Sequence, residues 1–91
     1  MVAPTFTMIL ALPQVLDLNA AAPLAAKLRS LRGRPITLDA SGVQRIGGLC
    51  LQVLLSASVT WALDNVPLKL LGASSAFNEA AALLGASPFT P

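Results

Sequence analysis

Strand-like and helix-like segments alternate along almost the whole chain, and this alternation limits the accessible folds more than any other feature. Apolar segments typical of strands, bounded by turn-forming residues, lie at 5–11, 35–41 and 67–71. Between them lie segments rich in Ala and Leu with helical periodicity. Such an order with short connections predicts helices packed on a parallel sheet. We expect an α/β fold with a mostly parallel four- to five-stranded sheet and about three to four helices.

The first helix is bounded by well-defined start and stop signals. It begins between Asn19, a good N-cap residue, and Pro23, which a first turn tolerates. Gly33 suits the position just after its last turn. Its buried face is an apolar stripe at spacing i, i+4, i+7, formed by Leu24, Leu28 and Leu31.

Two further elements complete the expected order. Residues 15–16 predict a short second strand, which ends at the turn residues Asp17 and Asn19. A last helix begins near Ser74 and Ser75 and stops at Gly85. Its buried residues are expected to be Phe77, Ala81 and Leu84.

The chain contains an unusually large share of apolar residues for its length. The 91 residues suffice for one domain, which we place at 1–91, and 55% are hydrophobic against 11% charged. This balance excludes disorder. A net charge of +2 without a dense basic stripe argues against nucleic-acid binding. A chain this small must expose part of its apolar surplus or bury it against a partner.

The residue types present exclude most catalytic arrangements. The chain has no His and one Cys, so it lacks Ser–His and Cys–His pairs, His-ligated zinc and an intrachain disulfide. Cys50 falls on a buried helix face, and Asp39 suits a turn or cap role. We therefore expect no enzyme activity and neither a cofactor nor a metal.

A membrane location is also disfavoured. The longest uncharged segments are 1–16, interrupted by two prolines, and 46–63, which contains several small polar residues. As a helix the second would span roughly 25 Å, less than the hydrocarbon core of about 30 Å. We expect no membrane insertion and a cytoplasmic location, which one free thiol fits.

A predicted helix at 49–63 has one face that is apolar and another that is uncharged but polar. At about 100° per residue, the sheet-facing side is formed by Cys50, Leu51, Leu54, Leu55, Ser58, Trp61 and Ala62. The opposite side is formed by Leu49, Gln52, Ser56 and Thr60, with Val53 and Leu63 at its margins. A solvated face usually carries Lys and Glu, so this side is typical of a docking surface. The alternative is that the chain simply uses few charges everywhere.

Two glycines precede this helix. Gly47 and Gly48 permit close backbone approach or a positive φ, and they leave the first helical N–H groups open to an anion. A phosphate-binding loop is not indicated, because no Lys-Ser/Thr pair follows and the G-x-G-x-x-G spacing is absent.

The segment 38–55 resembles the central motif of STAS domains, the sulfate-transporter and anti-sigma-factor-antagonist family. The family pattern there is Asp-x-Ser-x-Val, then a hydrophobic residue, an acidic residue, two small hydroxyl residues, Gly, and Leu entering a helix. This chain has Asp39, Ser41 and Val43, followed by Ile46, Gly47, Gly48, Leu49, Cys50 and Leu51. Leu16–Asp17–Leu18 and 70–77 also match, so the resemblance covers nearly the whole chain.

The chain departs from the family at the regulatory position. Family antagonists are switched off when a partner kinase phosphorylates the Ser or Thr at the helix start, and here that position is Leu49. The resemblance therefore implies the family's binding surface without its usual switch. It assigns partner binding to Ser41, Gly47, Gly48, Leu49, Gln52 and Ser56.

The resemblance implies a non-enzymatic regulatory domain that binds another protein in bacterial signalling. The expected partner is an anti-sigma or sensor-type kinase or a chemotaxis component. The alternative is an accessory subunit of a phospholipid or ABC transporter complex, and a homodimer is left open.

The helix start is expected to remain unmodified, because Leu49 has no hydroxyl group. Incubation with the partner kinase and ATP, followed by intact-mass measurement, should give no phosphate adduct. A stoichiometric adduct on Ser41 or Ser56 would show that the switch has moved along the chain instead of being lost.

Overall fold

The computed structural model describes residues 8–83, which form five strands and three helices in an alternating order. The elements are β1 (Met8–Ala11), β2 (Val15–Leu16), α1 (Leu18–Ser30), β3 (Ile36–Asp39), β4 (Arg45–Ile46), α2 (Gly48–Leu63), β5 (Leu68–Leu71) and α3 (Ser75–Leu83). The expected α/β fold is confirmed. The expected strand start at residues 5–7 and the burial of Leu84 lie outside the described residues.

Two parallel sheets share the five strands. The larger has the order β1-β3-β5, and β3 pairs in parallel with both neighbours, so that Leu38 lies between Leu10 and Leu70. The smaller joins β2 to β4, with Val15 opposite Arg45. The strand β4 is not evident from the sequence, because two residues carry no measurable periodicity.

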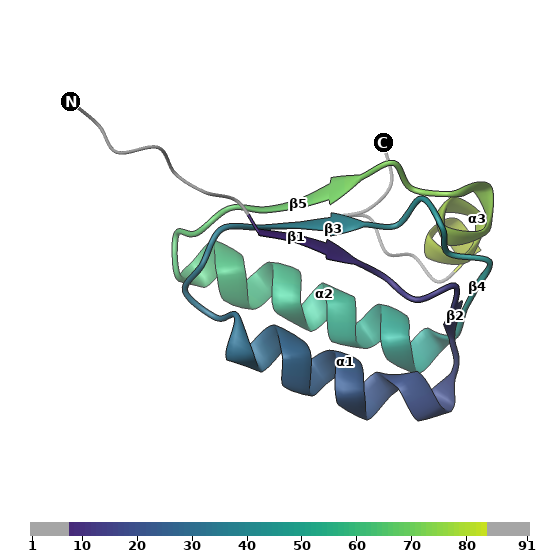
Figure 1. Cartoon of the computed structure of the whole chain (residues 1–91), viewed down its shortest axis with the longest axis horizontal. Coiled ribbons are helices and arrows are strands. Elements are labelled where there is room, and N and C mark those ends of the chain that lie inside the picture. Colours follow the sequence, from purple (N-terminus) through teal and green to yellow (C-terminus); the bar gives the residue numbers. More distant parts are fainter. Residues whose placement is uncertain (1–7, 84–91) are drawn as a thin grey trace.

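Helices α1 and α2 lie side by side on one face of the larger sheet and run in the same direction (Figure 1). Each connects one strand to the next in the order β1-β3-β5. Two right-handed crossovers that advance in the same direction place both helices on the same face. The third helix lies beside β4 at one end of the molecule (Figure 1).

The core lies between this sheet and the helix pair. In β3 the inward-facing Ile36 and Leu38 are fully buried, whereas Thr37 and Asp39 point the other way and are partly exposed. The stripe predicted for α1 is confirmed: Leu24, Leu28 and Leu31 are all buried. Phe77 and Ala81 of α3 are buried as predicted, and they close the end of the core near Val43.

The start of α1 differs from the sequence expectation. The N-cap is Asp17 instead of Asn19, and its carboxylate accepts hydrogen bonds from the N–H groups of Asn19 at 3.0 Å and Ala20 at 3.2 Å. Asp is as good a cap as Asn, so local preference alone does not decide between them. Pairing of β2 with β4 ends the strand at Leu16 and thereby leaves Asp17 at the cap position.

The buried side of α2 is rotated relative to the helical wheel. Its buried residues are Cys50, Leu51, Leu54, Ala57 and Trp61. Of the residues predicted to face the sheet, Leu55 is partly buried and packs against the core, Ser58 is partly buried and Ala62 is exposed, so the assignment of Ala62 is corrected. The reason is lateral packing: α1 covers the flank of α2 that carries Ala57, which the wheel could not anticipate.

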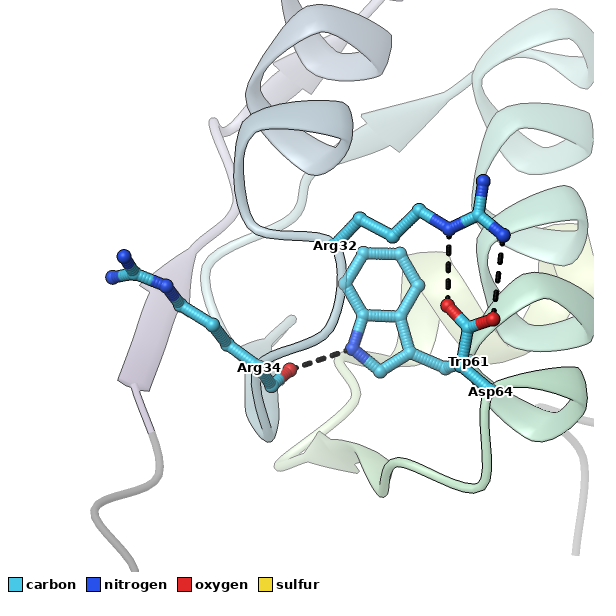
Figure 2. A network of polar contacts seen from close by, with 4 residues as sticks. All are labelled: Arg32, Arg34, Trp61 and Asp64. Atoms are coloured by element: carbon cyan, nitrogen blue, oxygen red, sulfur yellow. Dashed lines mark hydrogen bonds and ion pairs between the residues drawn. The ribbon is translucent and has the colours of Figure 1, made fainter.

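Two polar contacts tie the segment after α1 to the C-terminal end of α2 (Figure 2). The indole N–H of Trp61 donates to the carbonyl oxygen of Arg34 at 2.7 Å, and the indole is 2% exposed. The guanidinium of Arg32 pairs with both carboxylate oxygens of Asp64, at 3.0 and 3.3 Å, on the surface. These contacts hold the two helix ends together before each chain segment enters the sheet.

Replacing Trp61 with Phe should destabilise the fold by about 1–3 kcal/mol, because it removes the indole donor from the Arg34 carbonyl and leaves a void. Urea unfolding followed by circular dichroism measures the change. Arg32→Ala is the control, since an exposed ion pair contributes little, and its unfolding midpoint should stay close to wild type. Equal losses in the two variants would contradict this assignment.

Candidate functional site

An open groove of about 330 Å³ is lined by residues of α1 and α2, including residues of α2 that lie on its exposed side. Its buried lining residues, Leu28 and Ala57, form the base, and the exposed polar side chains of Arg29, Gln52 and Ser56 form a polar rim. From α1 the lining comprises Ala25, Leu28 and Arg29; from α2 it comprises Leu49, Gln52, Val53, Ser56, Ala57 and Thr60. The open shape suits side chains presented by another surface better than an enclosed small molecule.

Three of the residues predicted for partner binding meet in this groove. Leu49, Gln52 and Ser56 line it, and all three side chains are exposed. Leu49 is 48% exposed, whereas Leu54 on the buried side is 0% exposed. Spacings of three and four residues keep the three side chains on one helix face.

The remaining predicted residues lie outside the groove. Gly47 lines a second hollow, formed with residues of β2 and β4 and with the exposed Leu18. Of the two roles predicted as alternatives for this glycine pair, a positive φ is not adopted: Gly47 is an extended N-cap at φ −88°, and the positive-φ glycines within residues 8–83 are Gly33 and Gly72. No left-handed turn is needed here, because only Gly47 separates the end of β4 from the start of α2.

Ser41 belongs to a separate polar turn at the carboxyl end of β3. Its hydroxyl donates to Asp39 Oδ1 at 2.6 Å, and its backbone N–H donates to the same oxygen at 3.0 Å. These two hydrogen bonds lower the pKa of the Asp39 carboxyl. A Cβ on Gly72 would lie 3.3 Å from that of Ser41, so the turn packs closely against the end of β5. Ser41 is not among the residues that line either hollow.

The single thiol has a structural environment. Cys50 is 1% exposed and its Sγ donates to the carbonyl oxygen of Asp17 at 3.2 Å, which joins the starts of α1 and α2. Burial, with a smaller effect of the Asp17 charge, raises the pKa of the Cys50 thiol and disfavours the reactive thiolate. Within residues 8–83 no three His, Cys, Asp or Glu side chains are grouped to hold a metal ion.

The sequence alone does not reveal the α1 half of the groove. Ala25 and Arg29 line it because α1 lies beside α2, and no local pattern in either helix reports that proximity. Thr60 belongs to the predicted uncharged face of α2 and lines the groove, and Val53, at the margin of that face, lines it as well. The exposed Val59, in contrast, lies on α2 outside the groove lining.

A family model described as "Mlab, STAS domain" matches residues 4–89 of the chain. No curated protein and no solved structure matches the chain. Among the described residues, no helix is both long enough and apolar enough to cross a membrane.

The Asp39–Ser41 turn should make stability depend on pH. A carboxyl whose pKa is lower in the folded state stabilises that state above the unfolded pKa of about 3.9, and the contribution disappears as pH falls through the folded pKa. Asp39→Asn should therefore be less stable than wild type at pH 7, and the difference should shrink below about pH 4. Urea unfolding at both pH values measures it. A difference that is constant with pH would contradict a role for the carboxylate charge.

Proposed function

We propose that this chain, which belongs to the STAS domain family, is a non-enzymatic interaction domain that binds another protein through the groove between α1 and α2. STAS domains are generally non-catalytic and typically mediate protein–protein interactions. In this proposal Leu49, Gln52 and Ser56 contact the partner directly. Gly47 and Gly48 allow the partner to approach the start of α2, and Ser41 holds the preceding loop.

The exposed position of Leu49 in the groove carries the proposal. The Leu49 side chain is 48% exposed in the first turn of a helix that has no charged residue. Helix faces exposed to solvent usually carry charged side chains. Docking of an apolar segment into the groove would remove this side chain from water and leave the polar rim at the edge. Binding hot spots have this organisation, an apolar anchor surrounded by residues that exclude water.

The same position supports an interaction without a phosphorylation switch at the helix start. Family antagonists bind their partner when the hydroxyl at the helix start is not phosphorylated. Leu49 has no group that could accept phosphate. We propose that the groove is always competent to bind. Regulation would then act on the partner or on the amount of this protein.

We propose a bacterial signalling partner in the cytoplasm, namely an anti-sigma or sensor-type kinase or a chemotaxis component. The alternative partner is a subunit of a phospholipid or ABC transporter complex. Neighbouring genes for kinases or chemotaxis proteins favour the first class, and genes for an ABC transporter favour the second. A pull-down from the native host with wild-type protein and a groove variant would identify the partner directly.

Replacing Leu49 with Asp should reduce partner affinity at least about tenfold, or ~1.4 kcal/mol, because docking would bury an unpaired charge. Folding should hardly change, since a carboxylate near a helix N-terminus is tolerated. Val59→Asp is the matched control: Val59 is 57% exposed on the same helix but does not line the groove, so affinity should be retained. Binding titrations and thermal melts measure the two effects.

A second control tests the orientation of α2. Leu54→Asp should unfold the domain, because the carboxylate would be buried beside the sheet. If Leu49→Asp melts as early as Leu54→Asp, Leu49 belongs to the core and the proposal fails. If Leu49→Asp and Val59→Asp both bind the partner like wild type, the docking surface lies elsewhere.

A further inference from the structure

The charge on the two groove-forming helices has a single sign. Helix α1 carries Lys27 and Arg29 and helix α2 carries no charged residue, so neither helix contains an anion. Arg29 lines the groove, whereas Lys27 is exposed but is not among the lining residues. In the described part of the chain, Arg32 after α1 pairs with Asp64 at the end of α2, and this ion pair does not involve Arg29. Among residues 8–83, the groove lining therefore contains one cation, Arg29, and no carboxylate.

The groove also has two different ends. Because α1 and α2 run in the same direction (Figure 1), Leu49 in the first turn of α2 and Arg29 in the last turn of α1 mark opposite ends. Thr60, which lines the Arg29 end, follows Leu49 by eleven residues, or about 16 Å along the helix axis. One end is thus apolar and the other is cationic.

The backbone reinforces this polarity. Both helices end near Arg29, and the C-terminal end of a helix carries a partial negative charge. A docked helix that runs antiparallel to α1 and α2 would bring its partially positive N-terminus to that end. Acidic residues in the first turn of such a helix are favoured by its own dipole, and there they would face Arg29.

We infer that the groove binds an amphipathic helix of the partner protein, antiparallel to α1 and α2, with an acidic first turn at Arg29 and an apolar side chain about three turns later at Leu49. This inference rests on the proposed function and adds the chemistry and direction of the partner segment. The carboxylate pairs with the guanidinium at the rim, and the apolar side chain covers Leu49. Three helical turns match the distance between the two ends.

The test uses three synthetic helical peptides that share one apolar stripe. The first has Glu in the first turn, the second has Gln at the same positions, and the third has Glu in the last turn instead. Fluorescence anisotropy with the full chain should show the first peptide binding about threefold to fivefold more tightly than the other two, as for a partly exposed charge pair. The preference should shrink between 50 mM and 500 mM salt.

Charge reversal on the protein identifies the cation. Arg29→Glu should abolish or invert the preference for the first peptide, and Lys27→Glu, with the same change in net charge on the same helix, should largely keep it. Thermal melts verify that both exposed substitutions fold. A preference that survives Arg29→Glu, or an equal loss in both variants, would overturn the inference.

Failure of this inference and failure of the proposed function give different results. If the peptides bind equally or not at all, while Leu49→Asp still weakens binding to the native partner, the partner segment is not an acidic helix but the docking groove stands. Concentration-dependent dimerisation that Leu49→Asp abolishes would make a second copy the occupant and overturn the inference. Binding to phosphatidylglycerol vesicles that Arg29→Glu abolishes, without peptide binding, would overturn it in favour of a lipid.

Discussion

The parallel pairing of β3 with both β1 and β5 is the constraint on which the rest of the structure depends. Parallel neighbours require a crossover, and two crossovers of the same hand in the same direction bring α1 and α2 to one face of the sheet. The helices must then lie side by side and parallel. The groove between them, its two unlike ends and the burial of Ala57 all follow from that arrangement.

The helix pair combines a stabilising role with the proposed binding role. The inner face supplies large buried side chains such as Leu28, Leu54 and Trp61 to the core. The outer groove retains Leu49 and a polar rim, which contribute little to the fold and are free to meet a partner. Leu28 belongs to both the core and the groove lining, whereas the exposed groove residue Leu49 is not part of the core. The exposed part of the groove can therefore vary without loss of the core.

Much of the fold could be predicted from the sequence because its signals are local. The period of Leu24, Leu28 and Leu31 and the apolar density of 35–41 depend only on neighbours along the chain, and both correspond to observed elements. Other features needed tertiary contacts. The cap at Asp17 depends on where β2 stops pairing with β4, and the exposure of Ala62 depends on which flank α1 covers.

Composition, periodicity and motif were sufficient to predict an α/β domain of the STAS type with an uncharged face on its second long helix. The resemblance also predicts that Leu49 occupies the position of the family's phosphorylatable hydroxyl. The packing of the two helices was needed to show that Leu49, Gln52 and Ser56 share a groove with Arg29 and that Ser41 lies apart from it. The physical reason is that a helix determines its own faces through its period, whereas its neighbour is determined by strand pairing between residues far apart in the chain.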